Sequence, residues 1–229
     1  MNNFSYTEKN KEELFENGCT FFKFKSKEAK ATLEFWQRGI MKVIDKGEGG
    51  DRDIQCLNQV TQHWHHISFS RVNELLAKEN KISYYQKQID DYINEINNFF
   101  YEKDVKKVPD YPTFQIYNLN DCILPHTDGI SPGRNASLLM YLGTFHEGGP
   151  PKWYRELGGE LVISKPISTE YEEERDTYPP SVQFNCPPIS GICALIDFTK
   201  NNPIHEVKNM NKLGFTRIVL NTFLHNEQY

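Results

Sequence analysis

A histidine and an aspartate lie one residue apart in the segment ILPHTDGISPGR, residues 123–134. In an extended strand alternate side chains share a face, so the imidazole of His126 and the carboxylate of Asp128 can converge on one point. Both groups are metal ligands. Asp-Gly followed by Ser-Pro-Gly is also favourable turn chemistry, in which the aspartate hydrogen-bonds its own backbone. The pair alone therefore leaves two interpretations, a surface turn or half of a metal site.

A third ligand must come from elsewhere in the chain. His205 is the leading candidate because it lies at the edge of a predicted strand, after a turn-rich stretch. Two histidines and one carboxylate form a facial triad, which leaves adjacent positions on a divalent iron open for a bidentate co-substrate and dioxygen. By itself, His205 could equally be a histidine at the edge of a sheet.

A triad with one carboxylate leaves positive charge on the metal, which an anionic 2-oxoacid would neutralise. A second carboxylate on that oxoacid needs a fixed cation, and the planar guanidinium of Arg217 can bind it bidentately. We expect Arg217 across a hairpin from His205, with residues 209–214 as the turn. Alternation puts Asn221 on the same face as Arg217, and Tyr117 could offer its hydroxyl to the oxoacid. The alternatives are a cross-sheet ion pair for Arg217 and a satisfied core amide for Asn221.

The second half of the chain must supply the strands that position these side chains. Short runs rich in Ile, Val, Leu, Phe and Tyr are separated by Gly, Pro and Asn, which is typical of strands and turns. The runs predict strands at 113–119, 136–143, 159–165, 191–198 and 216–224. Without intervening helices, such strands favour an antiparallel barrel or double-sheet jelly roll with the earlier helices packed outside. The acidic segment 168–184 is predicted to be an exposed loop.

The sequence of the first half predicts helices. Residues 26–50 place apolar side chains at Leu33, Trp36, Ile40 and Ile44, with Ser26 as a candidate cap and a glycine cluster as the stop. Residues 82–100 repeat the spacing, and that helix should cover a sheet face.

Three histidines, His63, His65 and His66, surround Trp64 between these helices. A strand would put His66 opposite the other two, and no nearby carboxylate or cysteine completes a metal set. We interpret them as surface or core-edge residues that could line a substrate pocket.

Length and composition limit the number of domains, the kind of partner and the cellular location that we expect. The 229 residues suit one domain, with 1–108 as a mainly helical support region and 109–229 as a jelly-roll catalytic core. A net charge of −5 without a basic block argues against nucleic acid as a partner. No apolar run is long enough to span a membrane and the start is too polar for a signal peptide, so we expect a cytoplasmic protein. Five cysteines without CxxC spacing predict reduced, mostly buried thiols.

The ordered motifs of residues 113–224 resemble those of the iron(II)- and 2-oxoglutarate-dependent dioxygenases, particularly the branch similar to prolyl 4-hydroxylase. The matching elements, in chain order, are Tyr117, His126 with Asp128, Arg134, MYLG, LGGELVI, SGICALIDF, His205 with Val207, and Gly214 with Arg217. Two departures are Asn120, where the family usually has glycine, and a distinctive segment at 143–156.

The resemblance implies an α+β fold with a double-stranded β-helix core and N-terminal helices on the outside of the major sheet. It implies His126, Asp128 and His205 as ligands of Fe(II), Arg217 as the anchor of the remote carboxylate of 2-oxoglutarate, and Tyr117 as a helper. O2 would be the second co-substrate. Halogenating relatives lack the carboxylate ligand, so the presence of Asp128 favours hydroxylation.

The substrate is less well defined. Without an evident docking domain, a free amino acid or a similar small metabolite is expected, with a peptidyl or protein prolyl residue as the alternative. Desaturation or cyclisation at the same iron, and a non-catalytic jelly-roll binding module, also stay open. Trp153 could line the pocket mouth or be an exposed loop aromatic, and Arg134 could reach the substrate or brace its loop.

Overall fold

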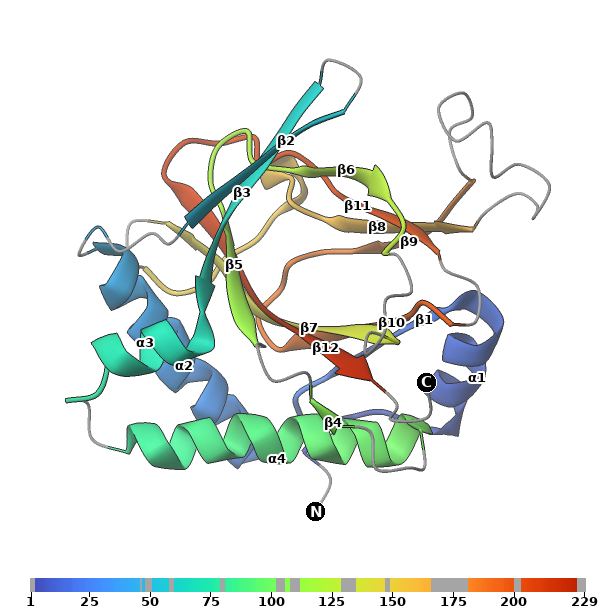
Figure 1. The fold of residues 1–229 in the computed structure, drawn as a ribbon, viewed down its shortest axis with the longest axis horizontal. Helices are drawn as coiled ribbons and strands as arrows, with labels where there is room; N and C mark the ends of the chain where they lie inside the picture. The colour runs from blue at the N-terminus through green and yellow to red at the C-terminus, as the bar shows by residue number, and fades with distance from the viewer. Residues whose placement is uncertain are drawn as a thin grey trace.

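In the computed structural model, the residues described are 3–45, 47, 51–57, 60–78, 81–101, 106–107, 112–128, 135–146, 149–165, 181–199 and 203–225. Within these ranges, two antiparallel sheets face each other, and long helices lie beneath the larger sheet (Figure 1).

The larger sheet has the strand order β1-β10-β7-β12-β5-β3-β2 among the described residues, and β4 pairs with β12. Its strands are β1 (Cys19–Lys23), β2 (Asp51–Leu57), β3 (Val60–Ser68), β4 (Lys106–Lys107), β5 (Thr113–Tyr117), β7 (Ala136–His146), β10 (Ile192–Asp197) and β12 (Phe215–His225). The predicted strands at 113–119, 136–143, 191–198 and 216–224 are all present here. Strands β1 to β3 were not predicted, because the alternation of the helical half is weak at those positions.

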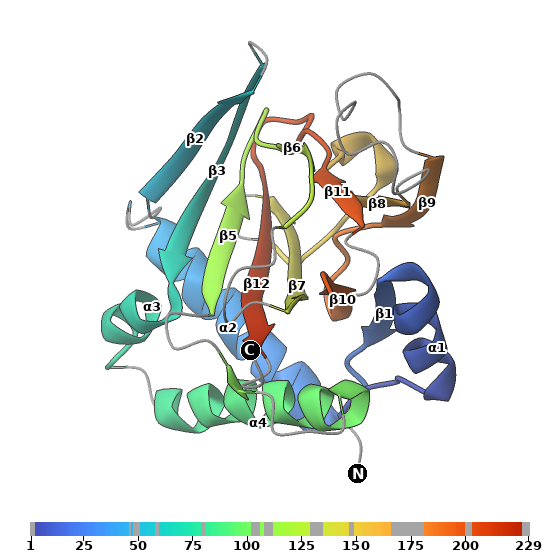
Figure 2. The same cartoon turned by 45° about the vertical axis from the view of Figure 1, so that its right-hand side comes forward.

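The smaller sheet has the order β6-β11-β8-β9. Its strands are β6 (Ile123–His126), β8 (Leu161–Lys165), β9 (Ser181–Cys186) and β11 (Ile204–Val207). Figure 2 shows it opposite β5, β12 and β7. The two facing sheets form the predicted double-stranded β-helix, and with the helices the fold is α+β.

The expected hairpin between His205 and Arg217 is wrong. Strand β11 belongs to the smaller sheet and β12 to the larger one, so residues 209–214 carry the chain from one sheet to the other. Each strand buries one face in the space between the sheets, β11 from the smaller sheet and β12 from the larger one.

Strand β7 shows how the larger sheet separates two cores. Leu138 and Met140 pack in the cluster that includes the helices, whereas Leu139 and Tyr141 pack in the cluster between the sheets. Both faces of β7 are buried, so its apolar run is continuous instead of alternating. The interior cluster is the one that adjoins the candidate site.

The helices cover the outer face of the larger sheet, as predicted. They are α1 (Glu8–Asn17), α2 (Lys27–Asp45), α3 (Phe69–Leu75) and α4 (Ile82–Tyr101), with a 3-10 turn η1 (Arg155–Leu157) before β8. The Ser26 hydroxyl caps α2 by accepting the backbone N–H of Ala29 at 2.9 Å. Trp36 of α2 is buried, and its truncation to alanine would cost roughly 3–5 kcal/mol of stability.

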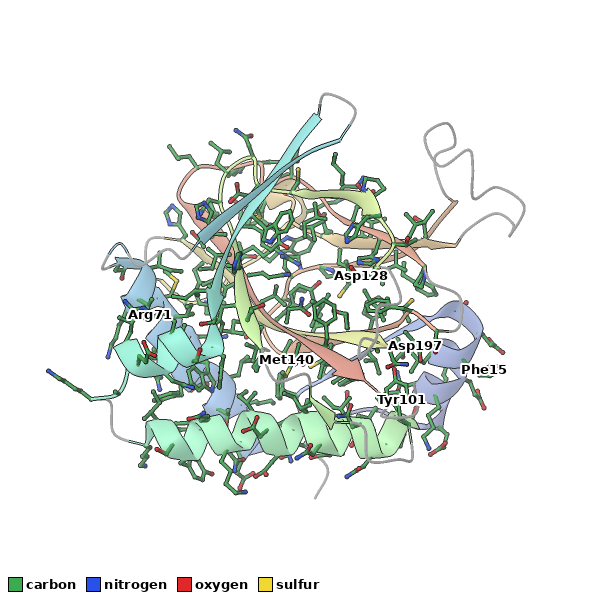
Figure 3. All side chains as sticks on the ribbon, viewed as in Figure 1. Phe15, Arg71, Tyr101, Asp128, Met140 and Asp197 are labelled. Atoms are coloured by element: carbon green, nitrogen blue, oxygen red, sulfur yellow. The ribbon has the colours of Figure 1, made fainter. Side chains whose placement is uncertain are left out.

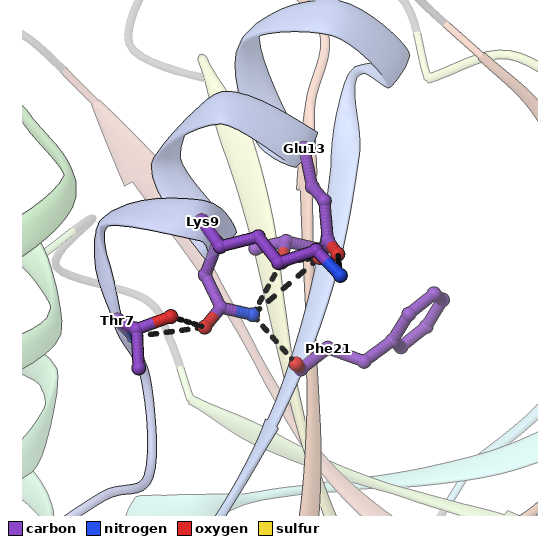
Figure 4. A network of polar contacts seen from close by, with 6 residues as sticks. Thr7, Lys9, Glu13 and Phe21 are labelled. Carbon is purple, nitrogen blue, oxygen red and sulfur yellow. Dashed lines mark hydrogen bonds and ion pairs between the residues drawn. The ribbon is translucent and has the colours of Figure 1, made fainter.

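A polar network fastens α1 to the edge strand β1 (Figure 4). Thr7 and Asn10 form the capping box of α1, and the Asn10 side chain also donates to the Thr20 hydroxyl and the Phe21 carbonyl, each at 2.9 Å. Thr20 in turn donates to Glu13. The helix therefore shields the outer edge of the larger sheet, which would otherwise be open to pairing with another chain.

The cysteines agree with the prediction of reduced thiols. Cys19, Cys122, Cys186 and Cys193 are free and buried, while the side chain of Cys56 lies outside what the structure describes. Across the described ranges, no helix combines the length and apolar character needed to cross a membrane.

Candidate metal centre

Two adjacent antiparallel strands bring the histidines of the candidate site together. His126 ends β6 and lies directly opposite His205 of β11. The two ring centroids are 4.3 Å apart. Asp128 follows two residues after His126, and Figure 3 shows it on the side of the smaller sheet that faces the larger sheet. Residues distant in sequence thus meet at one sheet position.

The three side chains converge as a ligand set. One Asp128 oxygen lies 3.7 Å from Nε2 of His126 and the other 3.4 Å from Nε2 of His205. One potential ligand atom from each residue fits within 4.8 Å of the others, and no other such group of His, Cys, Asp or Glu occurs among the described residues. Atoms that each bind a metal at about 2.1 Å on one octahedral face lie roughly 3 Å apart. Small side-chain rotations would therefore close this set on one ion.

The ring orientations leave the correct nitrogens free. Nδ1 of His126 donates to the Leu124 carbonyl at 2.9 Å, and Nδ1 of His205 donates to the Pro203 carbonyl at 3.1 Å. A carbonyl only accepts, so Nδ1 carries the proton in each ring. The Nε2 lone pairs consequently face Asp128, as metal ligation requires.

The electrostatic environment also favours ligation by His126. Burial lowers the pKa of His126 below its usual value of 6.5, and neighbouring His205 lowers it further, while Asp128 opposes the shift. His126 therefore stays neutral at neutral pH, which is the form that binds a metal.

Arg217 is a buried cation without an anion. The residue is 1% exposed, and its guanidinium lies over the Tyr117 ring, 4.3 Å from the centroid. One nitrogen, Nη2, donates to the Tyr141 hydroxyl at 3.4 Å, but Nε and Nη1 are buried without a hydrogen-bond partner. No described carboxylate pairs with it, so the alternative of a cross-sheet ion pair finds no partner. Two unused donors on a buried charge are an energetic cost that a bound carboxylate would remove.

Thr144 is a neighbour that sequence reasoning missed. It lies opposite Arg217 in the β7–β12 register, and its hydroxyl is buried without a partner. Phe145 packs in the helix-side cluster, so Thr144 points to the interior. A register shift between β7 and β12 just before this position resets the alternation, and no sequence signal reveals it.

Tyr117, the predicted helper in binding 2-oxoglutarate, lies beside Arg217. Its ring packs against Arg217, and its hydroxyl donates to the Gln115 side chain at 3.1 Å. Burial raises the pKa of Tyr117 to about 12, although the Arg217 charge opposes the shift. The hydroxyl is therefore protonated at neutral pH and able to donate.

Glycine is required beside Arg217. Gly159 has φ +76°, and a Cβ there would lie 2.5 Å from Met210 Sδ and 3.1 Å from Arg217 Cδ. Its close backbone approach leaves room for the arginine. At Asn120 the φ is +66°, a left-handed conformation that asparagine tolerates better than most residues other than glycine.

Two further candidate residues, Asn221 and Trp153, form hydrogen bonds to other groups of the protein. Asn221 is 5% exposed and accepts the Ser137 hydroxyl at 2.8 Å, consistent with a core amide. Trp153 is half-buried and donates its indole N–H to the Gly158 carbonyl at 2.9 Å, which anchors its own segment.

Arg134, most of the acidic segment 168–184 and the side chain of His63 lie outside the described residues. His65 and His66 are on β3.

No family model matches the chain, and no curated protein matches it by sequence. Solved structures do match over nearly its whole length. The alpha-ketoglutarate-dependent carbocyclase SnoK from nogalamycin biosynthesis has a TM-score of 0.63 at 12% identity, covering 97% of this chain and 85% of its own. A Pseudomonas putida prolyl-4-hydroxylase has a TM-score of 0.58 at 13% identity, with 96% and 98% coverage. The epimerase SnoN, solved with Fe3+, alpha-ketoglutarate and nogalamycin RO, has a TM-score of 0.56 at 10% identity. The match covers 96% of this chain and 83% of SnoN.

These matches establish the fold class. The chain has the double-stranded β-helix fold of the 2-oxoglutarate and iron(II) oxygenases, including prolyl 4-hydroxylases, and on it carries a His-Asp-His triad.

The residues present fit the two groups that this fold class uses. Two neutral imidazoles and one carboxylate are a donor set for divalent iron, and the unpaired donors of Arg217 fit a carboxylate.

Proposed function

We propose that this protein is an iron(II)- and 2-oxoglutarate-dependent dioxygenase. In our proposal it hydroxylates an unactivated C–H bond of a small substrate, a free amino acid or a related metabolite, and releases succinate and CO2. The observation that carries the proposal is the buried Arg217 guanidinium, which has two donors without partners in the interior cluster that also adjoins the triad. A bound carboxylate would satisfy these donors, and the spectroscopic test below separates an active iron site from a non-catalytic binding module.

Each residue of the site has a distinct task in this proposal. His126, Asp128 and His205 would hold the iron on one side, and Arg217 with Thr144 would hold the remote carboxylate of 2-oxoglutarate. When bound, the iron supplies dioxygen activation coupled to oxidative decarboxylation of the oxoacid. The chain itself orients the co-substrate and excludes water, because the aromatic rings of Tyr117 and Tyr141 bury the anchor. Low local dielectric strengthens the Arg217 contact.

Hydroxylation, as the kind of reaction at the iron, is also part of the proposal. The matching structures include a hydroxylase, a carbocyclase and an epimerase on one fold, so the fold alone does not select the product. Retention of the Asp128 carboxylate supports hydroxylation over halogenation. Cyclisation or desaturation at the same centre and a prolyl residue as substrate are the alternatives, and mass spectrometry of the product distinguishes them.

The metal site is tested with Asp128→Ala against Asp45→Ala, which removes an exposed carboxylate at the end of α2. Anaerobic addition of Fe(II) and 2-oxoglutarate should produce a weak visible charge-transfer band in the wild type and in Asp45→Ala. The band and substrate-coupled succinate formation should be lost in Asp128→Ala, with the far-UV circular dichroism unchanged.

Normal turnover by Asp128→Ala would show that the triad is wrong, and absence of the band in the wild type would favour a non-catalytic binding module. A screen of free amino acids and short peptides for stimulated 2-oxoglutarate decarboxylation then separates the two substrate classes. Stimulation by peptides alone would overturn the small-metabolite proposal.

A further inference from the structure

A cavity of about 430 Å³ lies beside the smaller sheet and is not part of the metal centre. It is bounded by the start of β6, the end of β11 and the segment that leads from η1 into β8. Its charged and amide side chains are Arg155, Glu160, Glu206, Lys208, Asn209 and Asn211. This is the volume of a small-molecule site.

The polar wall of this cavity belongs to the outer face of the smaller sheet. On β11, His205 faces Asp128 and Val207 packs in the interior cluster, so Glu206 between them points away. On β8, Leu161 and Ile163 pack in the interior cluster, so Glu160 just before the strand points outward. The sheet therefore separates these carboxylates from the metal ligands, and one small molecule cannot occupy both places.

Glu160 is a largely buried residue whose carboxylate has no counter-ion among the described residues. The residue is only 8% exposed, and its carboxylate makes no hydrogen bond or ion pair in the described structure. It nevertheless lines the cavity, so the unpaired charge borders a space large enough for a ligand. An unpaired carboxylate that faces a cavity of this size can bind a cation through charge-assisted hydrogen bonds.

The lysine that lines the cavity pairs with another carboxylate. Lys208 lies across from Glu160, since its backbone N–H donates to the Glu160 carbonyl at 2.9 Å. Its ammonium, however, lies 2.6 Å from Glu206. The side chain of Arg155 is exposed to solvent and forms no ion pair with any residue in the described ranges. Glu160 is thus left as the free anionic group of the cavity.

We propose that this cavity is a second ligand site, which binds an alkylguanidinium or alkylammonium cation with Glu160 as its anionic partner. The amide oxygens of Asn209 and Asn211 can accept further N–H groups from the same ligand. An organic cation fits better than a metal ion, because the triad is the only compact group of three metal-ligating side chains in the described residues. The site does not depend on the proposed dioxygenase activity.

Two probes of similar shape, one cationic and one neutral, test the proposal. The metal-free protein is titrated with butylguanidinium and with its neutral counterpart butylurea, using calorimetry and amide NMR shifts of Glu160, Lys208 and Asn209. Saturable binding of butylguanidinium at one site is expected, with butylurea roughly tenfold weaker or more, because hydrogen bonds between charged partners are stronger than neutral ones. Equal binding of the two probes, or no saturable binding of butylguanidinium, would overturn the proposal.

Substitutions at Glu160 and Glu156 test whether the cation binds in this cavity. Glu160→Gln should weaken butylguanidinium roughly tenfold or more, whereas Glu156→Gln, which removes an exposed carboxylate in η1 outside the cavity lining, should leave binding unchanged. Glu160→Asp keeps the charge and should retain measurable binding. Unchanged affinity in Glu160→Gln would show that the cation binds elsewhere. The probe comparison uses wild-type protein only, so the proposal stays testable even if a variant does not fold.

Discussion

Replacing Arg217 by methionine should weaken 2-oxoglutarate binding while leaving the unliganded protein at least as stable as the wild type. Truncating one partner of a buried charge pair costs about 2–5 kcal/mol, or roughly 30-fold to several thousand-fold in Kd. In the unliganded protein, Nε and Nη1 are buried without partners, and each unsatisfied donor costs about 1–3 kcal/mol. Removing them should outweigh the lost contact with Tyr117, about 0.5–2 kcal/mol, and the lost hydrogen bond to Tyr141, about 0.5–1.5 kcal/mol.

The two quantities are measured separately. Anaerobic calorimetric titration with 2-oxoglutarate, in the presence of Fe(II), gives the affinity, and denaturant unfolding of the metal-free protein gives the free energy of unfolding. Arg38→Met, which removes an exposed arginine of α2, is the control and should change neither. If Arg217→Met loses more than about 2 kcal/mol of stability while binding 2-oxoglutarate as tightly as the wild type, Arg217 is a packing residue and the anchor assignment is refuted.

Three further outcomes are expected. Gly159→Ala should lower the free energy of unfolding by about 1–3 kcal/mol, because its Cβ would lie 2.5 Å from Met210 Sδ; Gly47→Ala, with a similar φ of +80° and nothing within 4 Å, should cost only about 1 kcal/mol. Thr144→Val should raise the Kd for 2-oxoglutarate roughly tenfold without lowering stability in denaturant, since it removes an unpartnered buried hydroxyl; unchanged affinity would exclude Thr144 from the anchor. Burial raises the pKa of Tyr117 from 10.0 to about 12, so the unfolded chain loses this proton first as the pH rises. The free energy of unfolding should therefore fall between those pH values, and Tyr117→Phe should show a shallower fall in pH-dependent denaturation; an equally steep fall would contradict the shift.

The strands of the second half were predictable because their apolar runs are dictated by burial. Strand β7 and the strands at 192–197 and 215–225 are buried on both faces, so their composition alone marks them. Short strands such as β6 and β11 have only a few residues each, and their composition carries little signal. They form by pairing with each other and, for β11, also with β8, and these contacts exist only in the folded chain.

The first half was harder to predict for a related reason. The helices at 27–45 and 82–101 bury one regular stripe of side chains, and this periodicity is visible in the sequence. Strand β1 and the hairpin of β2 and β3 extend the larger sheet at its two ends. Strand β1 pairs with β10 and β3 pairs with β5, both far along the chain, so local pattern does not reveal these strands.

The residue types of the site and their order along the chain were predictable without a structure: two histidines, an aspartate and an arginine on an antiparallel β framework. Folding places β11 and β12 in different sheets, turns the Nε2 atoms of His126 and His205 towards Asp128, and buries Arg217 without an anion. It also places Thr144 beside Arg217 and the unpaired Glu160 on the other face of the smaller sheet. The physical reason is that residue type follows from local chemistry, whereas hydrogen-bond satisfaction and charge pairing depend on neighbours that only the folded chain brings together.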